Sequence, residues 1–334
     1  MAGRRSLRKL QLGRESTAGT AVAATTIFRG VGTIKDDFKV DPVSQDVGII
    51  GGTDEVNNSM KGGTLAVSQT PATFEQFLHI LEASVKTATP AADGAGTDYI
   101  YTYAFPTTSG NTIKTYTIEG GDDVQEEEMS YCFVKDWTLS GSGRTAYQLQ
   151  ANWQGREVAP STFTGALSLP TVNYMNFGMS KFYVEAIGGT YGTTIKANTL
   201  RGVNIKYASG IEAKDTADGR LDFSFLQGTD YVCTGTFEFE HDTTSNGLLK
   251  VDWRALTAKK IQLKIEGSTS FATPGTAYSV PTCIFNLPIR WSNFEKIGEA
   301  NGNDIVTGAF ISKYNVTAAA AGSVIVAAEL ASIP

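Results

Sequence analysis

The residues from Gly235 to Gly267 follow two different periods, which restrict this stretch to a strand, a helix and a second strand. Apolar and polar residues alternate in FEFE near its start and in KIQLKIE near its end, the period of a half-buried strand. Between them Leu249, Trp253 and Leu256 recur at helical spacing, behind a TSNG run that can supply an N-cap. We therefore expect one amphipathic helix lying across a sheet that has one apolar face.

A second segment with the same order begins at Gly63, where GTLAVSQTPATFEQFLHILEASV is followed, after a loop, by DYIYTYAF. Its helix is predicted over residues 70–86, opening at a Thr-Pro pair. A shift of 172 residues superimposes the apolar positions of the two segments, with Leu65 on Phe237, Val67 on Phe239, Phe77 on Leu249 and Leu81 on Trp253. We interpret this correspondence as an internal duplication.

Length and composition agree with two units. A chain of 334 residues is expected to form about two domains, and each half is long enough for its own core. The 35 glycines suit many hairpin turns. With 28 basic and 34 acidic residues the net charge is −6, so nothing in the overall charge favours tight binding of DNA or RNA.

Stretches rich in Pro, Gly, Ser and Thr divide the chain. The first terminal segment has few apolar anchors, so it is either solvated or ordered against a neighbouring subunit. The expected organisation is an N-terminal arm at 1–25, a first domain at 26–158, a linker at 159–180, a second domain at 181–315 and a C-terminal arm at 316–334. Long polar connections at 41–62 and 214–230 occupy the same relative place in the two domains, and such loops are mobile or have a partner.

Residues that carry chemistry are few. Cys132, Cys233 and Cys283 lie far apart without a CxxC motif, so we expect buried small hydrophobic residues and neither disulfides nor a zinc site. His79 and His241 have no neighbouring nucleophile motif, and His79 is expected to be a packing or surface residue.

Two further motifs also favour structural interpretations. The acidic run Asp122–Glu128 lacks the spacing of a calcium loop and is interpreted as a solvated loop. GSGRTA at Gly141 imitates a dinucleotide fingerprint, but a strand follows it, so we expect a hairpin turn. No metal or cofactor is therefore expected. Because neither a secretory signal nor a membrane span is recognised, cytosol-like surroundings and no membrane partner are expected as well.

Two strand segments present a polar face that is neutral or acidic. Apolar residues alternate with Gln148, Gln150 and Asn152 in the segment TAYQLQANW. In the FEFE segment, Glu238 and Glu240 lie opposite the phenylalanines. One side of each strand is thus predicted to lie on a core, while the other is polar.

Three strings resemble tail tube (major tail) proteins of bacteriophages with long, non-contractile tails: RESTAGTAVAATTIFRGVGTI at 14–34, YTIEGGDDVQEEEMSYCFVKDWTLSGSGRTAYQLQANWQGRE at 116–157, and VNIKYASGIEAKDTADGR at 203–220. The resemblance covers most of residues 14–315 and implies a mainly β fold, a β-sandwich or split barrel with one flanking helix. It also implies that six such domains form a ring-shaped β-barrel and that the rings stack into a tube in the virion tail.

For a chain with two such domains, the resemblance implies a homotrimeric, pseudo-hexameric ring whose channel conducts DNA without specific binding. The implied partners are further copies of the chain and the tape measure, terminator and distal tail proteins. A ring also removes exposed sheet edges, which otherwise invite aggregation. DNA must slide through such a channel, and neutral or acidic walls avoid the stalling that many phosphate contacts would cause.

We accordingly expect the lumen to be lined by Gln148, Gln150, Asn152, Glu238 and Glu240, the alternative being an outer solvent face. The long connections are expected to make inter-ring or inter-subunit contacts through Asp46, Ile49, Ile50, Asp54, Glu55, Asp218, Arg220 and Asp222.

Two other function classes stay open at this point. A monomeric β-sandwich binding module, such as a tail or capsid accessory protein or a carbohydrate-binding protein, would show exposed aromatic residues beside acidic groups. A hydrolase using paired acids such as Glu126 and Asp230 has no spacing argument behind it.

Overall fold

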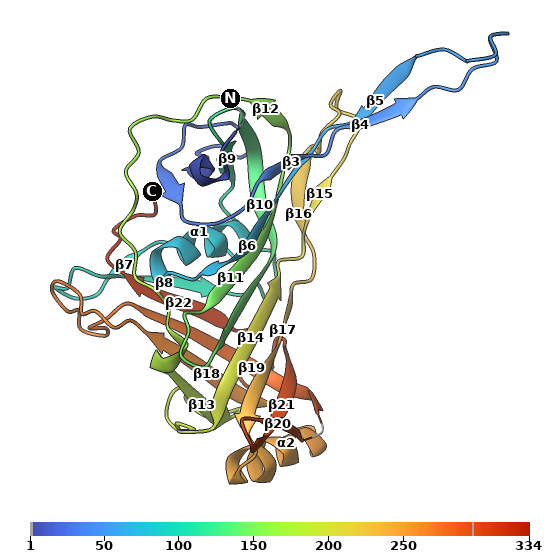
Figure 1. Ribbon diagram of the computed structural model, residues 1–334. Coiled ribbons are helices and arrows are strands. Elements are labelled where there is room, and N and C mark those ends of the chain that lie inside the picture. The colour runs from blue at the N-terminus through green and yellow to red at the C-terminus, as the bar shows by residue number, and fades with distance from the viewer. Residues whose placement is uncertain (1–2, 296) are drawn as a thin grey trace.

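The computed structural model, which describes residues 3–295 and 297–334, is built mainly from antiparallel strands (Figure 1). This confirms the predicted mainly β fold. The elements of the first half are η1 (Arg5–Leu7), β1 (Lys9–Arg14), β2 (Thr26–Phe28), β3 (Ile34–Asp36), β4 (Lys39–Pro42), β5 (Val56–Met60), β6 (Gly63–Pro71), α1 (Phe74–Ser84), β7 (Ala91–Ala92), β8 (Tyr99–Ala104), β9 (Tyr116–Gly121), β10 (Glu126–Ser142), β11 (Gln148–Gly155) and β12 (Val158–Pro160).

The second half begins after a linker that contains η2 (Phe177–Met179). Its elements are β13 (Ser180–Ala186), β14 (Leu200–Ala208), β15 (Ile211–Lys214), β16 (Phe225–Gly228), β17 (Val232–Glu240), η3 (Ser245–Leu249), α2 (Lys250–Arg254), β18 (Lys259–Glu266), β19 (Thr282–Phe294), β20 (Gly298–Ala300), β21 (Asn303–Ser312) and β22 (Ser323–Ala328).

One eight-stranded antiparallel sheet runs through both halves in the order β3-β6-β11-β10-β14-β17-β21-β19. The halves are joined where β10 pairs with β14, from Asp136 opposite Ala208 to Ser142 opposite Gly202. Among the pairings of the described strands none links β3 back to β19, so the sheet is open and the chain alone forms no closed barrel. Two independent domains at 26–158 and 181–315 are therefore too simple a description, because one backbone ladder crosses the boundary.

Two long strands each take part in a second layer. The N-terminal part of β10 lies between β9 and β12, and β1 and β2 continue that layer. The N-terminal part of β19 lies between β18 and β22, with β13 beyond β18. Each long strand carries a β-bulge, at Lys135 in β10, directly before the pairing with β14 begins, and at Ser292 in β19, three residues beyond the end of the pairing with β18 at Ile289. A bulge bends a strand and increases its twist, so one strand can serve both layers.

Helix α1 fills the space between the layers of the first half, and every one of its residues is buried. Thr73 caps it by accepting a hydrogen bond from the Gln76 amide at 3.3 Å. The prediction of a helix over 70–86 placed its start too early, because the residues up to Pro71 belong to β6 and pair with β11.

In the second half the predicted helix is a π turn followed by the short α2. Leu249 is buried, and Trp253 packs on Phe294 with ring centroids 5.9 Å apart. Leu256 is exposed and lies beyond the helix in a left-handed turn with φ 53°, so its predicted place on the apolar face was wrong.

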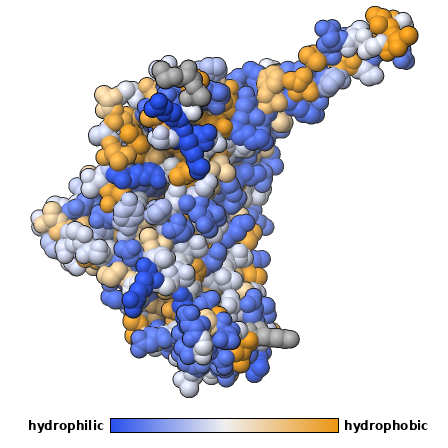
Figure 2. Space-filling model, in the orientation of Figure 1, coloured by the Kyte–Doolittle hydropathy of each residue, from blue (hydrophilic) through white to orange (hydrophobic). Residues whose placement is uncertain are grey.

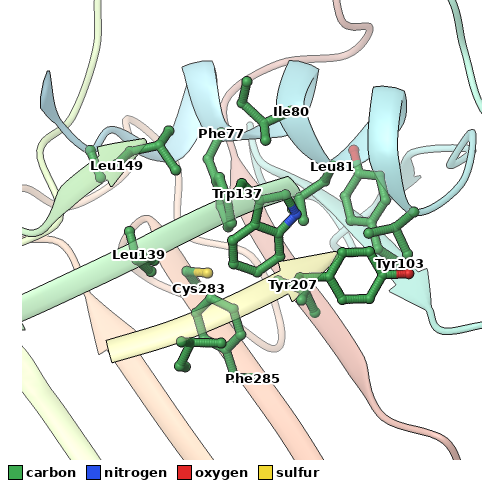
Figure 3. Close-up of a cluster of buried hydrophobic side chains, with 14 of the residues drawn as sticks. Phe77, Ile80, Leu81, Tyr103, Trp137, Leu139, Leu149, Tyr207, Cys283 and Phe285 are labelled. Carbon is green, nitrogen blue, oxygen red and sulfur yellow. The ribbon is translucent and has the colours of Figure 1, made fainter. Parts of the chain in front are cut away.

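The core lies between α1 and the eight-stranded sheet and draws on both halves (Figure 3). The ring of Phe77 on α1 meets Trp137 edge-on, with centroids 5.2 Å apart. Phe285 on β19 lies 6.3 Å from each of these rings, and Tyr207 on β14 stacks on Trp137 at 5.6 Å. Burial of apolar surface therefore joins the two halves in addition to the backbone ladder.

Both predicted arms are integrated into the fold. The ladder of β1 with β9 runs over six residue pairs, and Leu10 and Leu12 are buried. At the other end β22 lies between β19 and β8, with Val324 and Val326 fully buried. The expectation that 1–25 has few core anchors was wrong at β1, and 316–334 is more than an arm because β22 pairs on both sides, since apolar residues in LQL and SVIVAA complete sheets whose partners are distant in sequence.

Candidate assembly surfaces

The face of the eight-stranded sheet opposite the core is polar and gathers the predicted lumen residues. Gln150 lies opposite Thr138, and Gln148 opposite Ser140 on β10. The same face continues through Asn204, Thr236 and Glu238 to Thr307, and these side chains line one shallow hollow together with Gln148. The structure thus brings Gln148, Gln150, Asn152, Glu238 and Glu240 onto one surface, although they come from both halves.

Charges on the middle of this face nearly cancel. On β11, β14, β17 and β10 beyond its bulge, the face carries Asp136, Arg201, Lys206, Glu238 and Glu240. Arg201 pairs with both glutamates, its Nε lying 3.4 Å from Glu238 Oε1 and its Nη1 2.5 Å from Glu240 Oε1. These contacts, the hydrogen bond with Glu240 first, raise the pKa of Arg201. Asn152 donates to Asp136 Oδ1 at 3.0 Å.

The two ends of the sheet are unpaired edges. Strand β3 pairs with β6 alone among the described strands. The amide of Asp37 donates to the carbonyl of Gly62 at 2.9 Å, so by strand alternation the amide of Asp36 points away from β6. At the opposite end, β20 and the residues of β19 beyond Ile289 pair only with β21 in the described part of the chain. Such edges are templates for pairing with another chain.

The β15–β16 hairpin of the second half lies against the first half in a small apolar cluster of its own. Phe223, in the loop of that hairpin, packs on Tyr131 with ring centroids 5.1 Å apart and on Phe133 at 6.3 Å. Arg156 covers Tyr131, with Cζ 4.3 Å from the ring centroid, and its Nε donates to the carbonyl of Phe223 at 3.0 Å. This cluster was not predicted from the sequence, where its signal is limited to Phe223 and Phe225 at the end of the otherwise polar segment DTADGRLDFSF.

The β4–β5 hairpin and its loop project from the body of the molecule (Figure 1). Figure 2 shows apolar residues at the outer end of this projection. Ile49 is exposed and Ile50 fully so. The predicted contact residues Asp46, Ile49, Ile50, Asp54 and Glu55 all lie in the projecting loop and are exposed, so the structure places this group where a partner could reach it.

The other predicted contact group is held within the chain. Asp222 is buried and forms an ion pair with Arg220, 2.6 Å from its Nε to Oδ1, while Arg156 Nε lies 3.7 Å from the same oxygen. Asp222 therefore links the loop of the β15–β16 hairpin to Arg156 of the first half, and Arg220 pairs with Asp222 within that loop. Asp218 is exposed at the turn of that loop.

The residues considered for chemistry have structural surroundings. All three cysteines are free and buried, as predicted, and burial raises the pKa of Cys233 to about 12. His79 is buried against Tyr116, 3.3 Å from Nδ1 to the hydroxyl, and this burial lowers its pKa to about 3. GSGRTA forms the predicted hairpin turn between β10 and β11. Glu126 accepts a hydrogen bond from the Phe163 amide at 2.8 Å, and Asp230 lies in the turn before β17.

Within residues 3–295 and 297–334, no group of His, Cys, Asp and Glu side chains is arranged to hold a metal ion. None of the helices in these ranges has the length and apolar character needed to cross a bilayer. Comparisons of the chain with protein-family models and with curated protein sequences gave no match. The candidate site is therefore defined by geometry alone: one polar sheet face, two open edges and one projecting hairpin.

Proposed function

We propose that this protein is a structural subunit that assembles, through its open sheet edges, into rings and then into a tube. The observation that carries the proposal is the join between β10 and β14. If the two halves are equivalent units, each half should pair through its long strand with the edge strand of the next half. The isolated chain makes this contact once, between β10 and β14, and lacks the equivalent contact of β19. The missing contact would pair the β19–β20 edge with β3 of a second copy.

Equivalence of the halves is supported by their strand pairing. The first half is paired in the order β1-β9-β10-β11-β6-β3. The second half is paired in the order β13-β18-β19-β21-β17-β14. In each half a two-stranded hairpin, β4–β5 or β15–β16, follows the last strand of that order. A helix, α1 or α2, follows the neighbouring strand, β6 or β17, and a bulge lies in the long strand, β10 or β19. Such agreement is what a tandem duplication would produce, and it extends the repeat inferred from the sequence.

A ring follows from repeating this contact. Head-to-tail contacts close into a ring when their rotation is a simple fraction of a turn. Six units per ring, as the resemblance to tail tube proteins implies, correspond to three chains and twenty-four strands from their eight-stranded sheets. At about 4.8 Å per strand the sheet would measure roughly 115 Å around. Barrels of about 16 strands already leave an aqueous channel, so this one would be open.

The polar face then becomes the wall of the channel, because the opposite face is occupied by α1, α2 and the core. Its nearly balanced charges give a phosphate backbone few fixed positions to bind, which suits a conduit through which DNA slides. We accordingly propose a tail tube protein of a long, non-contractile-tailed phage, located in the virion and without an enzymatic role. Its proposed partners are further copies and the tape measure, terminator and distal tail proteins.

The decisive experiment is electron microscopy of the purified chain combined with its mass in solution. Rings or tubes with three chains per layer are expected. A protein that stays monomeric at the highest attainable concentration would overturn the proposal, and layers of six chains would contradict the equivalence of the two halves.

A further inference from the structure

The bulges of β10 and β19 mark equivalent positions in the two halves, so the surfaces next to them can be compared residue by residue. Next to the bulge at Lys135, Phe133 lies opposite Gln154 on β11. Next to the bulge at Ser292, Arg290 lies opposite Ile311 on β21 in the same way. Two residues after Gln154 comes Arg156, and two residues after Ile311 comes Lys313, so both positions are basic.

In the first half this surface is occupied. The β15–β16 hairpin lies on it, with Phe223 inserted beside Phe133 and with Arg156 holding the carbonyl groups of Phe223 and Ser224 at 3.0 and 2.9 Å. The hairpin directly follows β14, which pairs with β10. Edge pairing and hairpin docking are thus two parts of one contact between the halves.

In the second half the corresponding surface is an open hollow lined by Ile289, Arg290, Trp291, Ser292, Ile311, Lys313, Tyr314 and Asn315. Ile311 and Tyr314 are exposed at 38% and 51%, although the equivalent part of the first half is covered. Lys313 has no ion-pair partner within the described residues, whereas Arg156 has Asp222. The hollow therefore offers apolar surface and positive charge together.

The hairpin equivalent to β15–β16 is β4–β5, which directly follows β3 and projects from the body (Figure 1). The part of the hairpin next to the body, called its lower part below, consists of β4, β5 and the preceding Phe38. Its apolar residues Phe38, Val40 and Met60 are each about half exposed. Of the acidic residues of the hairpin, Asp46, Asp54 and Glu55 lie in the distal loop, and Asp41 on β4 pairs with Lys39, whose Nζ lies 3.1 Å from its Oδ1. The match with the hollow therefore rests on exposed apolar surface and on the equivalent position of the two hairpins in the repeat.

We propose that the lower part of the β4–β5 hairpin of one copy docks in the hollow at Ile289–Trp291 and Ile311–Asn315 of the neighbouring copy in the same ring. The inference rests on the proposed ring and specifies what holds each subunit to the next besides backbone pairing. It also gives the exposed apolar residues of this hairpin a partner, as the counterpart hairpin has one within the chain.

Cysteine cross-linking tests the docking. Val40→Cys and Tyr314→Cys are combined in one chain, rings are assembled, and a short bis-maleimide is added. The three native cysteines are buried, so the chain without added cysteines should give no cross-linked product. Covalent ladders that end at three chains are expected. A matched pair, Val40→Cys with Val251→Cys on the exposed side of α2, is expected to give at least tenfold less product.

The outcomes separate this inference from the proposed function. Rings of normal size without the Val40–Tyr314 product, or with equal product from the control pair, would overturn the docking and leave the ring proposal standing. Ladders that continue beyond three chains would place the hairpin on another ring and also overturn it. Absence of rings from the unmodified chain would remove both proposals. Should the double variant assemble poorly, Met60→Cys with Lys313→Cys is scored by the same criteria.

Discussion

Leu139 on β10 lies opposite Ile205 on β14, so a single ladder of backbone hydrogen bonds passes from the first half of the chain into the second. Both side chains point into the core beneath α1 and are almost completely buried. The join is therefore backbone pairing reinforced by apolar packing, and the predictions below concern this join, its missing counterpart and the surfaces around it.

The shared core predicts that the two halves unfold together. Phe285 belongs to the second half but contacts Phe77 and Trp137 of the first. Phe285→Ala should cost about 3–5 kcal/mol, as large aromatic truncations in cores do, while a single unfolding transition is retained. Guanidinium titration of the monomeric chain, followed by tryptophan fluorescence and circular dichroism, measures this. Two separate transitions, only one of them shifted, would contradict a common core.

The open edge at β3 predicts a variant that folds but does not form rings. Asp36→Pro removes an amide that points away from β6, so the thermal midpoint of the monomer should change by only a few degrees. Ring formation should require at least tenfold more protein. Asp36→Ala is the matched control, since it removes the same side chain and keeps the amide. Equal loss of assembly in both variants would assign the effect to the carboxylate and argue against edge pairing.

The polar face predicts a difference in accessibility between the monomer and the tube. In the monomer, Gln150→Cys should react both with a small maleimide and with a maleimide carrying a 20-kDa polyethylene glycol chain. The mass of that chain is roughly that of a small protein domain. In tubes the large reagent should react at least tenfold more slowly. Val251→Cys on α2, which lies on the opposite face, should stay reactive toward both reagents. If the two positions behaved alike, the face would lie outside the tube.

The exposed tip of the β4–β5 hairpin predicts an effect on stacking. Ile49→Ser with Ile50→Ser should leave rings intact and shorten or abolish tubes, because burying two isoleucine side chains against a partner is worth about 3–6 kcal/mol. Electron microscopy with sedimentation distinguishes rings from tubes. Serine replacement of Val251 and Leu256, exposed on the opposite face, controls for general loss of apolar surface. Tubes of unchanged length would remove the tip from the inter-ring contact.

The burial of His79 predicts a loss of stability in acid. Its pKa is about 3 in the folded chain and about 6.5 in the unfolded one, so the unfolded state binds the additional proton between these values. Stability from the neutral ring is complete above pH 6.5 and falls toward pH 3, by up to about 1.4 kcal/mol per pH unit. As the pH falls from 6.5 to 3, the free energy of unfolding should therefore decrease more in the unmodified chain than in His79→Gln. His241→Gln, at a partly exposed site, is the control, and parallel pH profiles for His79→Gln and the unmodified chain would contradict the prediction.

The short-range predictions were largely correct, because they depend on neighbours in the sequence. Alternation placed Gln148, Gln150 and Asn152 on the face opposite Leu149 and Trp153, and helical spacing located α1 around Phe77. The errors also have local causes: Pro71 ends a strand and Thr73 supplies the cap, while Leu256 follows a helix that has already ended. The burial of the three cysteines was predicted correctly, and His79, expected to be either a packing or a surface residue, is buried.

What the sequence by itself determined was therefore the period of each segment and the side that each residue presents. Which strands pair was decided only by the tertiary structure, since backbone hydrogen bonds carry no sequence signal and any apolar strand can complete an apolar sheet. Thus β1 and β22, which lie in segments that looked like arms, pair within the sheets, and Asp222 pairs with Arg156 of the first half. The two edges at β3 and β19–β20 exist only because the folded sheet ends there.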